Sequence, residues 1–74
     1  MNEKTFGQTI KAERQNKGLT QLEVVALSGI SETQLVRLEA DQVKKPHRST
    51  LKLLTSCFGL ELNPVLASFG YSLE

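Results

Sequence analysis

The chain has 74 residues and a formal net charge of +1, with nine lysine and arginine residues against eight aspartates and glutamates. A chain of this length makes one domain, and its apolar residues are spread too evenly for a disordered segment and run too briefly for a membrane span. The first residues lack the apolar core of a signal peptide and the single cysteine excludes an internal disulfide, so we expect a cytoplasmic protein.

The first predicted helix covers about residues 5–17. Phe6 and Ile10 lie on its inner face at helical spacing, and Gly18 ends it as a left-handed C-cap. Arg14 follows Ile10 by four residues, so it falls on the same face. Its guanidinium either reaches solvent at the rim of the core or takes part in a buried ion pair. The residues alone leave both alternatives open.

Two helix starts of the same type come next, eleven residues apart. Thr20 is followed three residues later by Glu23, and Ser31 is followed at the same distance by Gln34. In such a capping box the hydroxyl accepts from a free helical N–H, and the later side chain accepts from the N–H of the cap residue. Each cap contributes about 1 kcal/mol to helix stability.

The two starts predict short helices over about residues 21–28 and 32–39, with Gly29 at the turn between them. Glycine suits this turn because it adopts a positive φ without steric cost. Two helices joined by such a short turn form a helix-turn-helix, in which the second helix usually enters the major groove of DNA. The residues expected to face the core are Val24, Val25, Leu27, Ile30, Leu35 and Leu38.

The outward side of the second helix is the candidate for reading bases. It carries Glu32, Thr33, Gln34, Val36, Arg37 and Ala40. An ordinary solvated helix face is the alternative, and the paired helix starts favour contact with DNA over it. Arg37 is the candidate for reading guanine through O6 and N7. Val36 either meets a thymine methyl group or has no role.

A basic segment follows the second helix. No acidic residue occurs between positions 42 and 60, a stretch that contains Lys44, Lys45, His47, Arg48 and Lys52. A solvated loop is the ordinary interpretation, but the position directly after the proposed recognition helix favours contact with phosphates. His47 has no Cys/His cluster around it and is expected to be a surface residue rather than a metal ligand.

Two further helices are predicted over about residues 48–58 and 64–69. The inner stripe of the first of them is Leu51, Leu54 and Phe58, and Gly59 ends it. The second is expected to begin with Asn63 as N-cap and Pro64 as its first residue. No strand pattern occurs anywhere, so the prediction is an all-α fold of five helices.

The sequence contains no arrangement that is typical of catalysis. Cys57 is expected to be a small core residue, because a nucleophilic thiol needs a partnered base and His47 does not look positioned to serve. There is no phosphate-cradling glycine loop and no paired-carboxylate pattern. We therefore expect no enzyme activity, no cofactor and no metal site.

The C-terminal end is more apolar than one short helix needs. Its apolar residues are Leu62, Val65, Leu66, Phe69, Tyr71 and Leu73. They either close the core or form a two-fold dimer surface, and we expect both roles to occur among them. Phe69 and Tyr71, together with Leu53, are the candidates for the dimer surface. A homodimer would place two recognition helices about 34 Å apart, which matches a palindromic site.

Over about residues 6–71 the chain resembles the phage-repressor and Cro-type helix-turn-helix regulators, the XRE family. The matching pieces are Gly18-Leu19-Thr20-Gln21, Gly29-Ile30-Ser31, Leu38-Glu39, Lys44-Lys45-Pro46, Leu51 with Phe58-Gly59-Leu60, and Phe69-Gly70-Tyr71. Their order and spacing carry the resemblance, because no single piece is specific. The family implies a compact five-helix bundle of the lambda-repressor-like DNA-binding type with a central helix-turn-helix.

The resemblance also implies roles for individual residues. The positions that touch base edges in the family are Glu32, Thr33, Gln34 and Arg37. The positions that hold phosphates are Gln21, which also braces the recognition helix, and Lys44, Lys45 and Arg48, with Ser31 as a contact secondary to its capping role. Arg14 and Glu39 match positions that form a buried ion pair in some members, and this role is preferred for Arg14 over a DNA contact.

Three residues depart from the family pattern. Val25 stands where alanine is frequent and is expected to widen the packing of the two central helices slightly. Asp41 replaces a frequent glycine after the recognition helix. Glu32 places an acid where glutamine or a basic residue is common, and its carboxylate can accept from the N4 amine of cytosine.

We therefore predict a regulator that binds double-stranded DNA in a sequence-specific manner, acting as a dimeric repressor on a palindromic operator. The second hypothesis is an interaction module whose main partner is another protein, such as a toxin neutralised by an antitoxin. The chain stops just after the last predicted helix, which leaves almost no tail to wrap a toxin and counts against this hypothesis.

Overall fold

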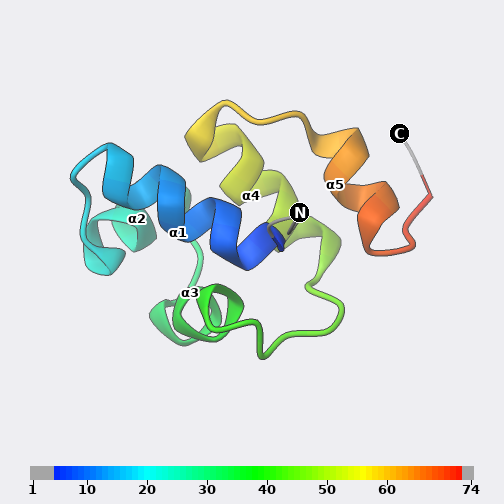
Figure 1. The fold of residues 1–74 in the computed structure, drawn as a ribbon, viewed down its shortest axis with the longest axis horizontal. Coiled ribbons are helices and arrows are strands. Elements are labelled where there is room, and N and C mark those ends of the chain that lie inside the picture. Colours follow the sequence, from blue (N-terminus) through cyan, green and yellow to red (C-terminus); the bar gives the residue numbers. More distant parts are fainter. Residues whose placement is uncertain (1–4, 73–74) are drawn as a thin grey trace, which may run out of the picture.

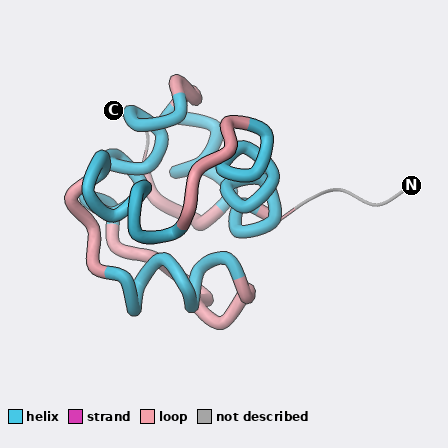
Figure 2. Tube along the Cα trace, turned by 90° about the vertical axis from the view of Figure 1, so that its left-hand side faces the viewer, coloured by secondary structure: helices cyan, strands magenta, loops and turns pink. Residues whose placement is uncertain are grey.

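The computed structural model describes residues 5–72, and that range contains five helices and no strand (Figure 1). The helices are α1 (Phe6–Asn16), α2 (Gln21–Ser28), α3 (Glu32–Glu39), α4 (Arg48–Phe58) and α5 (Leu62–Ser68). Figure 2 shows them joined by loops, the longest of which leads from α3 to α4. None of these helices has the length and apolar composition needed to cross a membrane. The predicted all-α class and five-helix bundle are confirmed.

The hydrophobic core lies where the first four helices meet. α1 packs on α3, α2 packs on both α3 and α4, and α5 packs on α4. The buried apolar residues of the main cluster are Ile10, Val24, Ile30, Leu35, Leu38, Leu54 and Phe58. Leu66 is fully buried and anchors α5. The helix-turn-helix of α2 and α3 is thus held from behind by α1 and α4.

The prediction that Leu27 faces the core is wrong, because its side chain is 66% exposed. Val24 and Ser28 are buried on the inner side of α2, with Val25 half-buried beside them. At 3.6 residues per turn Leu27 falls outside this side. The last buried residue of α2 is thus Ser28, which is polar. Its Oγ donates to the carbonyl of Val24 at 2.7 Å.

The predicted start of α5 is also wrong, because the helix begins at Leu62 and its N-cap position is Glu61 rather than Asn63. Pro64 is therefore the third helical residue instead of the first. A backbone N–H in the first turn has no acceptor within the helix, so a proline loses no hydrogen bond there. The Asn-Pro pair marks the first turn correctly but does not locate its first residue.

Two complete capping boxes begin α1 and α2. Thr20 Oγ1 accepts from Glu23 N at 3.1 Å, and Thr20 N donates to Glu23 Oε1 at 2.8 Å. Thr5 and Gln8 repeat this geometry at the start of α1, with distances of 3.1 and 3.0 Å. The box at Thr20 is predicted from the sequence. The box at Thr5 has the same pattern but is not among the predicted helix starts.

The capping box predicted for α3 is present in one direction only. Ser31 Oγ accepts from Gln34 N at 3.1 Å, but the Gln34 side chain does not return to the cap. Gln34 Oε1 instead accepts from the Thr50 hydroxyl of α4 at 3.4 Å. A contact between distant parts of the chain has replaced the local one.

Gly7 allows the backbones of α1 and α3 to touch. A Cβ atom at this buried position would lie 2.0 Å from the Leu38 carbonyl oxygen, so no side chain fits without separating the helices. A glycine inside a helix costs about 1 kcal/mol relative to alanine, and the close approach explains why it is present. Nearby, Asp41 has a φ of +58° and its carboxylate accepts from the Thr5 hydroxyl at 2.6 Å.

Candidate nucleic-acid interface

α3 presents the predicted base-reading residues to solvent. Glu32, Thr33, Gln34 and Arg37 are all exposed. The opposite side of the helix is buried through Leu35, Leu38 and Glu39. In Figure 1 α3 lies along one edge of the molecule, and the loop that follows runs on along the same edge. The structure therefore leaves all four residues accessible to solvent, and their contact with bases stays a prediction.

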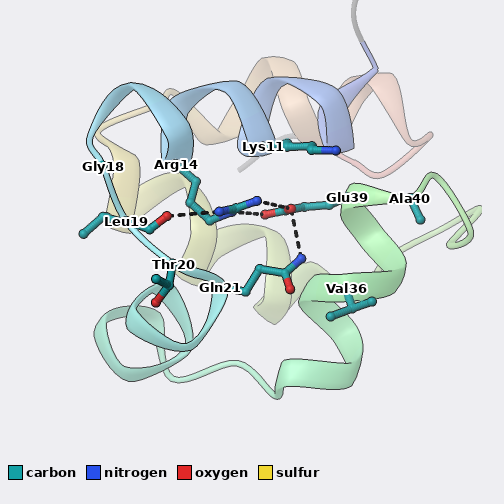
Figure 3. A pocket seen from close by; sticks show the side chains of 9 residues that line it. All are labelled: Lys11, Arg14, Gly18, Leu19, Thr20, Gln21, Val36, Glu39 and Ala40. Atoms are coloured by element: carbon teal, nitrogen blue, oxygen red, sulfur yellow. Dashed lines mark hydrogen bonds and ion pairs between the residues drawn. The ribbon is translucent and has the colours of Figure 1, made fainter.

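A buried ion pair fixes the orientation of α3 against α1. Arg14 Nε donates to Glu39 Oε2 at 2.8 Å, and a second guanidinium nitrogen donates to Glu39 Oε1 at 2.9 Å (Figure 3). The side chains of Arg14 and Glu39 are only 12% and 4% exposed. Of the two alternatives that the sequence left open for Arg14, the structure contains the ion pair.

Two further bonds extend this ion pair to the start of α2. A third Arg14 nitrogen donates to the Leu19 carbonyl at 3.0 Å, and Gln21 Nε2 donates to Glu39 Oε1 at 3.1 Å. The hydrogen bond to Glu39 raises the pKa of the Arg14 guanidinium above its usual value, with the Glu39 charge acting in the same direction and burial against it. Arg14 is therefore a permanent cation that ties α1, α2 and α3 together.

The resemblance implies two roles for Gln21, which are to brace the recognition helix and to bind a phosphate. Its bond to Glu39 provides the bracing contact. The phosphate contact stays a prediction, and one amide hydrogen of the Gln21 side chain is left for it after the bond to Glu39.

An open groove of about 530 Å³ lies beside this ion pair (Figure 3). Lys11 of α1, Gln21 at the start of α2, and Val36 and Ala40 of α3 line its walls. The first backbone N–H groups of α2 have no acceptor within the helix and are directed toward its N-terminal end. An anionic group at this end would therefore meet amide donors, with the Lys11 ammonium on the far wall of the groove.

The loop between α3 and α4 carries its lysines on the surface. Lys44 and Lys45 are exposed, whereas Pro46 is buried. His47 is exposed as expected, but it also caps α4, because its Nδ1 accepts from Ser49 N at 3.1 Å. Sequence reasoning missed this role, since histidine is not among the usual N-cap residues.

Arg48 points to the C-terminal end of the chain. Its guanidinium donates to the Ser72 carbonyl and lies 5.8 Å from the centre of the Tyr71 ring. Lys45 Nζ lies 4.7 Å from the same ring centre, and the Tyr71 hydroxyl donates to the Pro46 carbonyl at 2.7 Å. The phosphate role predicted for Arg48 stays a prediction, but its guanidinium already has a partner within the chain.

The three candidates for the dimer surface lie in different environments. Leu53 is 43% exposed on α4. Phe69 is half-buried and meets Phe6 edge-on, with ring centres 6.0 Å apart. Tyr71 is half-buried against the loop. Leu53 is the most exposed of the three, and the dimer itself stays a prediction.

No group of three His, Cys, Asp or Glu side chains in residues 5–72 could hold a metal ion together. Cys57 is a half-buried free thiol packed against the core. The groups that could recognise a ligand are therefore the amide, hydroxyl and cationic donors on and around α2, α3 and the loop.

Comparisons with known proteins agree with this arrangement. A family model described as helix-turn-helix matches residues 10–65, more than half of the chain. Among solved structures, the chain is similar to a chain in a complex of the SinR and SinI proteins, with a TM-score of 0.75 and 21% sequence identity. The match covers 95% of this chain and 68% of that one, and at this identity it shows the shared fold. No curated protein matches the sequence.

Proposed function

Because the chain belongs to the XRE-type helix-turn-helix family of DNA-binding transcription regulators, we propose that it is a repressor that binds a palindromic operator as a dimer. The observation that carries this proposal is the exposed side of α3, held at a fixed angle by the buried pair of Arg14 and Glu39. The major groove of DNA accepts a helix whose exposed side carries polar side chains that can bond to base edges.

The residues of α3 have distinct tasks in this proposal. Arg37 donates two hydrogen bonds to guanine O6 and N7, and Glu32 accepts from the N4 amine of cytosine. Thr33 and Gln34 meet neighbouring base edges. In this proposal Val36, which is 42% exposed, meets a thymine methyl group.

The surrounding elements hold the phosphate backbone. The first turn of α2 offers N–H donors, and Lys44 and Lys45 supply cations from the loop. These contacts set the register of the protein on the duplex and carry no base information themselves. The proposed activity is therefore binding in the cytoplasm without a chemical step, and repression follows from competition with polymerase for the operator.

We place the dimer contact at the exposed side of α4 that carries Leu53. A two-fold axis at this contact would relate two protomers, so each would bind one half of an inverted-repeat site.

Selection from a random pool of double-stranded DNA tests the whole proposal at once. We expect an enriched site with two inverted halves about one helical turn apart. Enrichment of an asymmetric site would contradict the dimer, and the absence of any enrichment would contradict the DNA target.

Arg37→Ala tests the base-reading side of α3. We expect roughly 10- to 100-fold weaker binding to the selected site, relaxed preference at one base pair and nearly unchanged binding to unrelated DNA. Arg37→Lys is the matched control, because it keeps the charge and loses the forked donor pair. Titrations with both DNAs measure the effect. An equal loss on every sequence would identify Arg37 as a phosphate contact instead.

A second candidate function is binding to another protein. The solved neighbour is a complex of two proteins, and this chain exposes Leu22 and Leu27 on α2, at 62% and 66%. These observations do not outweigh the helix-turn-helix, so we rank a protein partner second to DNA. Co-purification of one partner in a fixed ratio from the native source, with no DNA site enriched, would reverse this order.

A further inference from the structure

The C-terminal end of the described chain folds back onto the loop that follows α3. Gly70 has a φ of +82°, and the Tyr71 N–H donates to the Leu66 carbonyl at 2.9 Å. This is the hydrogen-bond pattern of a helix end that reverses the chain direction. Residues 70–72, here called the C-terminal strap, are thereby carried from α5 to the loop before α4.

The strap contacts the loop at two points and the first residue of α4 at a third. The Tyr71 hydroxyl donates to the Pro46 carbonyl at 2.7 Å. The Tyr71 ring lies 4.7 Å from Lys45 Nζ, within the range of a cation–π contact. Arg48 donates to the Ser72 carbonyl and flanks the same ring. The Tyr71 side chain thus contacts Lys45 and Pro46 and lies beside Arg48.

The loop has few other constraints of its own. Within the described part of the chain, residues 43–46 form no hydrogen bond between their backbone and another backbone group. Val43 packs against the core, but Lys44 and Lys45 are exposed. A loop without such bonds samples many conformations unless other contacts order it. The Tyr71 hydroxyl supplies a bond that the loop backbone does not make.

We propose that Tyr71 is a positioning residue for DNA binding, which orders residues 43–47 in advance so that Lys44 and Lys45 meet the phosphates without further rearrangement. The inference rests on the proposed function. Order present before binding raises affinity because less conformational entropy is lost in the complex. Arg48 then serves to hold the strap, and Lys44 and Lys45 provide the charges for the backbone.

A positioning residue and a contact residue leave different traces in salt titrations. Each lysine that neutralises a phosphate contributes about one unit to the slope of log affinity against log salt. Tyr71 carries no charge to a phosphate, so its loss lowers affinity at every salt concentration and leaves the slope unchanged. A general loss of stability would move neither quantity while the protein stays folded.

The experiment compares Tyr71→Phe, Tyr71→Leu and the wild-type chain on the selected site and on unrelated DNA. We expect Tyr71→Leu to bind both DNAs about tenfold more weakly with the wild-type slope. Tyr71→Phe keeps the ring and loses one hydrogen bond, so we expect a loss of about three- to fivefold. The backbone ¹⁵N order parameters of residues 43–45 without DNA should be lowest in Tyr71→Leu and intermediate in Tyr71→Phe.

Phe6→Leu is the matched control, because it alters a half-buried aromatic residue that packs edge-on against Phe69 and belongs to neither the proposed DNA surface nor the candidate dimer surface. It should lower thermal stability and leave DNA affinity unchanged. An equal loss of affinity in Phe6→Leu would overturn the inference, as would wild-type binding by Tyr71→Leu or a slope lowered by one unit. If Tyr71→Leu does not fold, Tyr71→Phe decides by the same criteria.

The two proposals fail in different ways. Wild-type protein that binds no DNA at any salt concentration removes the proposed function and this inference together. Wild-type protein that binds its selected site, with Tyr71 variants that bind it equally well, removes the inference alone. The ¹⁵N order parameters of the loop then show whether the strap orders the loop for a reason unrelated to DNA.

Discussion

The two regions that shape the proposed DNA surface are built in opposite ways. The α1–α3 junction, formed by Gly7, Arg14, Leu38 and Glu39, combines direct backbone contact with a buried ion pair. The loop after α3 exposes Lys44 and Lys45, and it is held by Val43 against the core and by the contacts of Tyr71. A change at the α1–α3 junction therefore alters both the angle of α3 and the stability of the fold. A change in the loop can alter the contacts with phosphates while the protein remains folded.

Gly7→Ala should break the α1–α3 junction with the largest effect. The new Cβ would meet the Leu38 carbonyl oxygen, and the two helices would have to separate, which costs roughly 3 kcal/mol of unfolding free energy. Urea denaturation measures this loss. Gly29→Ala is the control, because its φ is +84° but its surroundings are open, and it should cost about 1–2 kcal/mol. Stabilisation by Gly7→Ala, as helix propensity alone predicts, would refute the close contact.

Arg14→Met should weaken the same junction by about 2 kcal/mol, because Glu39 remains buried without its cation. We expect a smaller loss of stability than for a fully buried pair, because the Arg14 side chain is 12% exposed and solvent partly screens its charge. The double variant Arg14→Met with Glu39→Leu should recover most of the stability, because neither charge is then left unpaired. A double variant no better than the single one would show that the pair contributes through geometry that apolar packing cannot replace.

Lys44→Ala probes the loop and should leave stability within about 0.5 kcal/mol of wild type. The slope of log affinity against log salt should fall by about one unit. Lys17→Ala is the control at the exposed end of α1, outside the loop, and should leave the slope unchanged. If Lys44→Ala lowers stability and leaves the slope unchanged, the contrast between the two regions is lost.

Much of the fold could be predicted because its signals are local. Thr20 and Ser31 begin α2 and α3 as caps, and Gly18, Gly29 and Gly59 have the positive φ that helix ends require. Such signals depend on neighbours within four residues, so they are readable in the sequence. The same holds for the exposed side of α3, which follows from helical spacing once Leu35 and Leu38 are assigned to the core.

Several misses involve partners far away in the sequence, whereas the start of α5 and the His47 cap of α4 depart from the usual local patterns. Gln34 bonds to Thr50 instead of its own cap, and the sequence does not predict the bond from Tyr71 to Pro46. Gly7 is explained only by a carbonyl of another helix. Leu27 was expected inside because it is apolar, but hydrophobicity does not tell which side of a short helix is buried.

The Thr5 hydroxyl has a practical consequence for anyone who trims this protein for crystallisation or NMR. It accepts from Gln8 N and donates to Asp41, which sits in a left-handed conformation directly after α3. A version shortened to start at Phe6 would thus lose a helix cap and also release the residue where the chain leaves α3. A shortened version should therefore keep Thr5, even though α1 itself begins one residue later.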